Sequence, residues 1–282
     1  SCGAELICDE TTAAPSCPYC GNPVVVSGNV SGIYKPKKVI PFRYDKEQAK
    51  AKYRSFLKGK TLLPNAFKSE AVIDEIKGIY VPYWTFDGKA NARMWFDATR
   101  RRYWSEGDVD CVETSYYKLF RSGSVRFADV PVDASAKIDD QLTQSIEPFN
   151  TSDARDFSDN YLAGYYADKY EKTAQETRDI ANQRIANSTR SLFASTTSHY
   201  DSCIPSSSSL SISQGKQEYV MYPVWLLNVK YKDKMYSFAM NGQTGKFVGE
   251  LPSDNGKLLS ILAAVFVGVT LVASLLQFLM MR

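Results

Sequence analysis

Ile79-Tyr80-Val81-Pro82-Tyr83-Trp84-Thr85-Phe86 is the stretch of this 282-residue sequence that decides its fold. Its aromatic and β-branched side chains favour a β-strand, because they fit a pleated, half-buried surface. Asp87-Gly88 follows directly, and such a pair is the strongest short-range signal for a hairpin turn. Residues 90–99 are then expected to form the returning strand. The region from 79 to 132 is therefore predicted to be an antiparallel meander.

Further turns are expected on either side of this strand pair. Glu106-Gly107-Asp108 predicts the next hairpin turn, Ser122-Gly123 a turn or bulge, and the serines at 206–209 a loop. Strands resume from Glu218 to Val248. Within them Asn241-Gly242-Gln243-Thr244-Gly245-Lys246 reads as a tight turn, and turn chemistry explains these residue types without a ligand.

Helices are predicted beside the strands. Asp45 is expected to cap a helix from about Lys46 to Lys58, and Ser69 a shorter one. Residues 170–195 place small and apolar side chains at helical spacing. Together with 18 Tyr, 14 Phe and 4 Trp, these patterns predict an α+β fold with an antiparallel-sheet-rich body over residues 38–250.

The sequence also contains an internal echo. Ile79-Tyr80-Val81-Pro82-Tyr83-Trp84 is matched by Met221-Tyr222-Pro223-Val224-Trp225, and each Pro-x-Trp strand is followed by a turn and a second strand. A duplicated sheet unit and chance similarity both explain the echo, because repeat assignments rest on more than two copies.

Residues 258–281 carry no charge and lie between Lys257 and Arg282. Crossing a bilayer takes roughly 20 apolar residues, so this segment is predicted to be a transmembrane helix with the lipid bilayer as its partner. Lys246 and Lys257 precede it and only Arg282 follows, which favours a cytoplasmic body. We expect a cell-membrane protein, single-pass over this sequence, with further spans open beyond residue 282.

Catalytic patterns are not recognisable. A phosphate-binding loop needs Gly, four residues and then Gly-Lys-Ser/Thr, but Arg54 stands where Gly59-Lys60-Thr61 would require the first glycine. His199 is the single histidine, and no nucleophile-elbow motif accompanies it. We therefore expect that the chain is not an enzyme. Lys plus Arg is 34 and Asp plus Glu is 31, and a net charge of +3 is too small to argue for a nucleic-acid partner.

A metal site is predicted near the start of the chain. Cys17-Pro18-Tyr19-Cys20-Gly21 has the spacing of one zinc knuckle, and Cys2-Gly3 resembles the end of another. The ligands would be Cys2, Cys17 and Cys20, with a fourth expected three positions before Cys2, so that residues 1–26 form a partial zinc ribbon. Cys8 as a substitute ligand and a redox role for the Cys-x-x-Cys pair are the alternatives.

These features together resemble a family. The two cysteine–glycine pairs, the 76–84 strand and the 241–246 turn occur together in bacterial, mainly Firmicute, membrane proteins described as zinc-ribbon proteins of the transcription factor IIB type. The resemblance implies a structural zinc ion, an α+β body and C-terminal hydrophobic helices. Some relatives carry a primosomal helicase label, which the missing phosphate-binding loop contradicts in this chain.

Two functions are consistent with these features. The first is a membrane-anchored, non-catalytic interaction or scaffold module that binds an unknown protein partner at the cytoplasmic face. The second is a membrane-tethered nucleic-acid-binding protein that uses the ribbon, although fold analogy is a weak warrant for function. The modest charge favours the first.

Overall fold

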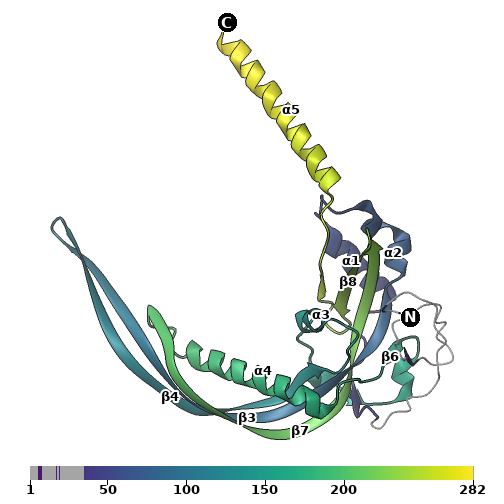
Figure 1. Cartoon of the computed structure of the whole chain (residues 1–282), viewed down its shortest axis with the longest axis vertical. Helices are drawn as coiled ribbons and strands as arrows, with labels where there is room; N and C mark the ends of the chain where they lie inside the picture. Colours follow the sequence, from purple (N-terminus) through teal and green to yellow (C-terminus); the bar gives the residue numbers. More distant parts are fainter. Residues whose placement is uncertain (1–5, 8–16, 18, 20–34, 282) are drawn as a thin grey trace.

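The computed structural model describes residues 6, 7, 17, 19 and 35–281. One mixed, mostly antiparallel sheet forms both a body and a long curved arm, and the apolar helix α5 (Asn255–Met280) stands away from the body (Figure 1). The predicted α+β fold class is therefore confirmed.

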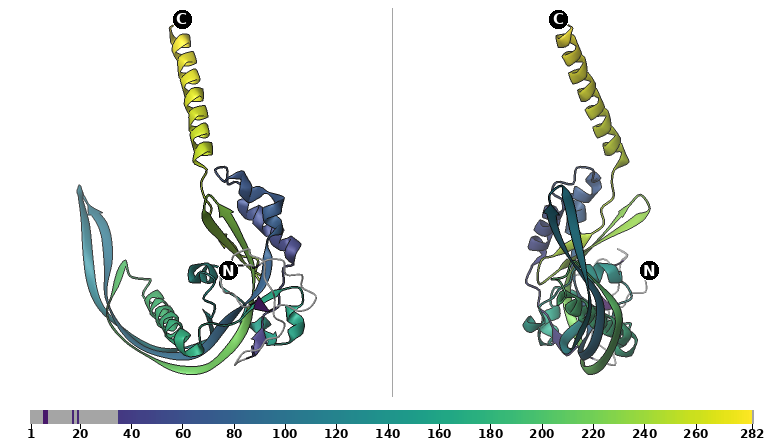
Figure 2. Two further views of the ribbon diagram at one scale, coloured as in Figure 1. Left: turned by 45° about the vertical axis from the view of Figure 1, so that its right-hand side comes forward. Right: turned by 90° about the vertical axis from the view of Figure 1, so that its left-hand side faces the viewer.

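Three strands are much longer than the rest: β3 (Lys77–Glu106), β4 (Val109–Asp133) and β7 (Ser202–Tyr231). The shorter strands are β1 (Leu6–Ile7), β2 (Lys38–Val39), β5 (Arg155–Asp156), β6 (Tyr166–Asp168), β8 (Lys234–Asn241) and β9 (Phe247–Gly249). In the body the order is β1-β6-β3-β7-β2-β5, with β4 also on β3, β8 also on β7 and β9 on β8. The far parts of β3, β4 and β7 leave the body together and form the arm (Figure 2).

Helices pack on both parts of this sheet. They are α1 (Lys46–Leu57), α2 (Glu70–Asp74), α3 (Asp140–Ser145) and α4 (Ala174–Ser195), with 3-10 turns η1 (Asn65–Lys68), η2 (Thr151–Asp153) and η3 (Asp159–Leu162). The caps predicted at Asp45 and Ser69 are confirmed, since both side chains accept from a backbone N–H of the first turn. Helix α4 lies on the concave face of the arm (Figure 1). There Phe193 packs with Ala92, Met94 and Phe96.

The predicted turn at Asp87-Gly88 is wrong. Strand β3 continues through it, and the register shifts between Phe86 and Gly88 against both neighbours, as at a β-bulge. Because β4 and β7 supply partners on both edges, the strand does not need to fold back. Ser122-Gly123 and the serines at 206–209 likewise lie inside β4 and β7. The turn predicted at Glu106-Gly107-Asp108 is confirmed, with Gly107 at φ 64°.

The central strands pair about an approximate two-fold axis. Val81 lies opposite Tyr222, and Pro82 and Pro223, one position beyond each, lie opposite Met221 and Tyr80. The strands on the two outer edges of the β3–β7 pair also match, because β6 runs parallel to β3 and β2 runs parallel to β7. The short first strand of one half, β2, pairs with the long strand β7 of the other half, and β6 pairs in the same way with β3. The two halves are therefore intertwined.

Equivalent side chains make equivalent hydrogen bonds across this axis. Trp84 Nε1 donates to the carbonyl of Lys172 at 2.9 Å, and Trp225 Nε1 donates to that of Tyr44 at 3.1 Å. Each acceptor directly precedes a helix cap, Thr173 for α4 and Asp45 for α1, and both caps form a capping box. Each indole thus fixes the start of one helix to the central strands.

A third equivalence follows at the ends of β4 and β8. The carboxylate of Asp133 accepts from the N–H of Ser135 at 2.8 Å, and the amide oxygen of Asn241 accepts from that of Gln243 at 2.9 Å. Between acceptor and donor in each turn, the N–H of Ala134 donates to the carbonyl of Pro82, and that of Gly242 donates to the carbonyl of Pro223. The register gives each half a matching turn, while a common origin of the halves stays a prediction.

Candidate functional site

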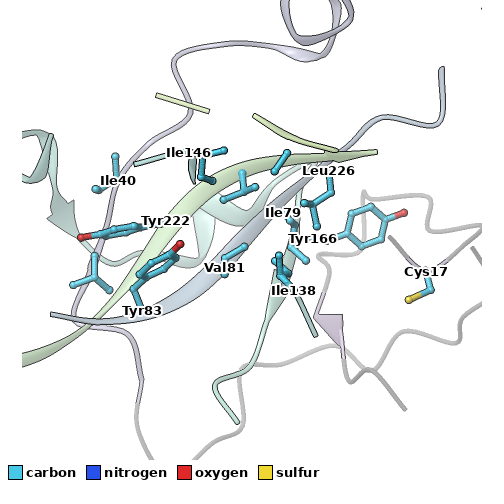
Figure 3. Packing of buried hydrophobic residues seen from close by; sticks show 13 residues of the cluster. Cys17, Ile40, Ile79, Val81, Tyr83, Ile138, Ile146, Tyr166, Tyr222 and Leu226 are labelled. Carbon is cyan, nitrogen blue, oxygen red and sulfur yellow. The ribbon is translucent and has the colours of Figure 1, made fainter. Parts of the chain in front are cut away.

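Cys17 is the one predicted metal ligand that lies among the described residues; Cys2 and Cys20 lie outside them. Its side chain is 2% exposed and belongs to the core cluster that includes Ile138 and Tyr166. Figure 3 shows it at one end of that cluster, on the side of Tyr166. The backbone N–H of Tyr19 donates to Cys17 Sγ at 3.4 Å, so the sulfur acts as an acceptor inside its own turn.

Tyr19 connects this part of the chain to the body. Its hydroxyl donates to Asp168 Oδ2 at 2.8 Å, and its carbonyl accepts from Asn228 Nδ2 at 3.0 Å. Burial, reinforced by the nearby Asp168, raises the pKa of Tyr19 well above its ordinary value. The phenol therefore keeps its proton at neutral pH and remains a donor to β6.

Asp168 is the centre of a buried polar cluster. It is 0% exposed and also accepts from Ser135 Oγ at 2.9 Å and from Lys137 Nζ at 3.2 Å. Lys137 pairs in addition with Glu171 at 2.7 Å. Burial raises the pKa of Asp168, although Lys137, Tyr19 and Ser135 act in the opposite direction. The carboxylate is thus used internally and holds Tyr19 against the body.

Asp133 lies next to this cluster and is less well satisfied. Burial raises its pKa to about 7, although the N–H of Ser135, which donates to it, acts in the opposite direction. Its Oδ2 atom and the hydroxyls of Tyr83 and Tyr222 have no hydrogen-bond partner among the described residues. The two tyrosine rings stack with centroids 4.3 Å apart. At the equivalent position of the other half, Asn241 donates to two carbonyls, so the halves differ here in charge and in hydrogen bonding.

Sequence reasoning missed Asp133, Ser135 and Asp168. The one available signal was the Pro-x-Trp echo, which places Asp133 opposite the same strand position as Asn241. Within the part of the chain that the structure describes, no group of three or more His, Cys, Asp or Glu side chains could hold a metal ion. The predicted zinc site depends on residues outside that part.

Comparison with curated proteins shows a clear similarity. The chain is 35% identical over 256 residues to the uncharacterized protein YdjG of Bacillus subtilis (strain 168), a match that covers 91% of this chain and 75% of YdjG. The chain belongs to the same family as YdjG. Because the match covers 256 of 282 residues, at most 26 residues lie outside it. The similarity to YdjG therefore includes both the body and the arm. No family model and no solved structure matches.

The segment that follows the body is helix α5. Among the described residues it is the one helix long and apolar enough to cross a membrane, and none of it is buried. Its first turn is fixed to the body, because Lys257 Nζ donates to the carbonyl of Leu63 and to Asn65 Oδ1. The N–H of Asp254, which caps the helix, donates to Leu62 at 2.7 Å. The helix therefore starts at a defined place beside the loop after α1.

Proposed function

We propose that this chain is a membrane-anchored, non-catalytic interaction protein whose body lies on the cytoplasmic face. The observation that carries the proposal is the uncharged part of α5, residues 258–280, which has no buried residue in the described chain. An apolar helix exposed to water over that length would be unstable, whereas a bilayer satisfies it.

The surroundings of Lys257 support the orientation. The loop that holds this residue follows Lys58 and Lys60 and leads into η1, which ends at Lys68. All three of these lysines are exposed. Lysines beside the start of a span favour the cytoplasmic side, so the body and arm would lie in the cytoplasm.

Cys2, Cys17 and Cys20 would hold a structural zinc ion, as the resemblance to zinc-ribbon proteins implies. The N–H of Tyr19 directed at Cys17 Sγ fits a thiolate ligand, since outer-shell donors stabilise metal-bound groups. When bound, the ion would hold the knuckle closed, and the knuckle in turn presents Tyr19 to Asp168. With the fourth cysteine expected before Cys2, four thiolates would leave no open position for a substrate, so we propose a structural role.

The experiment on membrane insertion uses the full chain and its Leu271→Arg, Leu275→Arg double variant. Fluorescent-protein and alkaline-phosphatase fusions at the N-terminus report the side of the body, and alkaline extraction reports insertion. We expect fluorescence without phosphatase activity, a wild-type chain that resists extraction and a double variant that is released. Phosphatase activity, or wild-type release, would refute the proposed topology.

A second candidate is membrane-tethered nucleic-acid binding. Arg100, Arg101 and Arg102 are exposed next to exposed Tyr103 and Trp104, a combination that single-stranded nucleic acid uses. It ranks second because residues 100–115 contain three arginines and four carboxylates (3 − 4 = −1). A salt-titrated RNA and DNA binding assay with the zinc-loaded chain tests it, since phosphate contacts make affinity fall steeply with salt.

A further inference from the structure

The arm ends in a segment of only two strands. Pairing between β3 and β7 stops at Thr99 and Ser202, whereas β3 and β4 continue together to their turn. Every β3 residue from Arg100 to Glu106 is exposed. We call residues 100–115 the hairpin end. A two-stranded hairpin alone is at best marginally stable in water, so a third strand or a covering surface would stabilise it.

The hairpin end exposes apolar side chains on both faces. Tyr103 is 67% exposed and lies opposite Val112, which is 55% exposed. Trp104, on the other face, is 42% exposed and lies opposite Cys111. Aromatic side chains of this kind, next to arginine, are the residues that contribute most to protein–protein interfaces.

One edge of β3 is open beyond Thr99. The N–H of Asp201 donates to the carbonyl of Thr99 at 3.0 Å, and its carboxylate accepts from the N–H of Arg101. In a strand the N–H and C=O groups of alternate residues face the same edge. The N–H and C=O groups of Tyr103 and Ser105 therefore face the edge that β7 has left, and no strand of the described chain pairs with them.

The charges at this edge indicate the chemistry of a partner. The three arginines of the hairpin end lie on β3, whereas its four carboxylates lie at the turn or on β4, which pairs with the other edge of β3. The charge beside an added strand is therefore positive, although the sum over residues 100–115 is −1. Arg100 donates to the carbonyl of His199 and lies over the ring of Tyr200, and Arg102 lies over Trp104. Neither Arg101 nor Arg102 forms an ion pair with a described carboxylate. The carboxylate of Asp201 already occupies the first backbone position of the edge, where a neighbouring strand would place a carbonyl. An incoming strand with further carboxylates would complement the arginines.

The position of the hairpin end indicates where such a partner lies. In Figures 1 and 2 the arm curves away from the body, and its tip rises on the same side as α5, near the level at which that helix begins. If α5 spans the bilayer, the hairpin end is close to the membrane surface. Another protein at the same surface can reach it.

We propose that the open edge of β3 beyond Thr99 binds an extended acidic segment of another membrane-associated protein by β-strand addition. Main-chain hydrogen bonds to Tyr103 and Ser105 would give affinity, and contacts of carboxylates with Arg101 and Arg102 would give specificity. This inference rests on the proposed function, because it identifies the surface that the interaction protein uses.

The test uses the full chain in detergent micelles and two synthetic peptides, one alternating Glu and Val and the other alternating Lys and Val. We expect the Glu–Val peptide to slow hydrogen exchange at Tyr103 and Ser105 and the Lys–Val peptide to leave it unchanged. Arg101→Glu should weaken Glu–Val binding at least about tenfold. Arg93→Glu, the same change on the same face of β3 but within the three-stranded part of the arm, should not weaken it.

A proline pair separates strand addition from side-chain contact. Tyr103→Pro and Tyr103→Ala both remove the ring, but only proline removes the N–H that faces the open edge. Binding lost with proline and retained with alanine supports strand addition, and equal binding by both overturns it. Exchange across α4 checks that each variant is folded.

Absence of protection by the Glu–Val peptide overturns the inference. If Arg101→Glu then makes the chain self-associate, the arginines serve only to keep the edge from pairing. Because micelles replace the bilayer here, this result is independent of the membrane topology measured with the fusions. Failure of the proposed function and failure of the inference are therefore distinguishable.

Discussion

Replacing Asp133 with Asn should stabilise the chain, and more so as pH rises. Burial moves the pKa of this carboxyl from 3.8 to about 7, so the folded chain holds a proton that the unfolded chain releases between these values. The free energy of unfolding is therefore not reduced by Asp133 at low pH, where both states are protonated, and it falls as pH rises from about 3.8 toward 7. At 1.36 kcal/mol per pKa unit, burial of this carboxyl group costs about 1–2 kcal/mol at pH 5 and about 4 kcal/mol at pH 8.

Asparagine keeps the oxygen that accepts from Ser135 and avoids the charge, as Asn241 does at the equivalent position. Urea unfolding of the full chain in detergent, followed by tryptophan fluorescence, gives the free energy of unfolding at both pH values. The advantage of Asp133→Asn over wild type should grow by about 2–3 kcal/mol from pH 5 to pH 8. A variant that is less stable than wild type by the same amount at both pH values would refute this account of Asp133.

Three further predictions test other parts of the fold. Trp84→Phe and Trp225→Phe should each lower the free energy of unfolding by about 1–3 kcal/mol. The two losses should be similar, because the two indoles make equivalent hydrogen bonds. A large difference between them would contradict the two-fold relation. Tyr19→Phe should cost about 1.5–3 kcal/mol, since it removes a hydrogen bond to the Asp168 carboxylate, and urea unfolding measures it against Tyr236→Phe as a control. Burial raises the pKa of Glu218, but its lysine partners outweigh this and lower it overall. The stability that this carboxylate provides is therefore lost as pH falls below its ordinary pKa, and Glu218→Gln should flatten the acid side of the stability curve; an unchanged acid side would count against these ion pairs.

Local chemistry predicted the features that depend on a few neighbouring residues. Asp45 and Ser69 cap helices because the acceptor and the N–H groups it satisfies lie within three positions of each other. The turn at Glu106-Gly107-Asp108 needs only a glycine that tolerates a positive φ. In both cases no distant part of the chain decides the outcome.

Features set by distant partners were not predictable in this way. Asp87-Gly88 has the composition of a turn, but β4 and β7 pair with β3 on both sides of it and keep the strand extended. The candidate site joins Tyr19, Ser135 and Asp168, which are far apart in sequence and meet only after the sheet has formed. Of the predicted zinc ligands, the structure places Cys17 alone, and zinc binding stays a prediction.

The intertwining of the two halves has a consequence for synthesis on the ribosome. Val39 pairs with Met221, so the first strand of the body waits for a partner made 182 residues later (221 − 39). At about 5–20 residues per second, that delay is about 10–40 s. Throughout it, the aromatic central strand of the first half has one bare edge, which a nascent chain exposes to aggregation or to chaperones. We therefore expect that neither half forms a stable domain when expressed alone. The segment that becomes α5 is translated only after the partners of the body's sheet have been made.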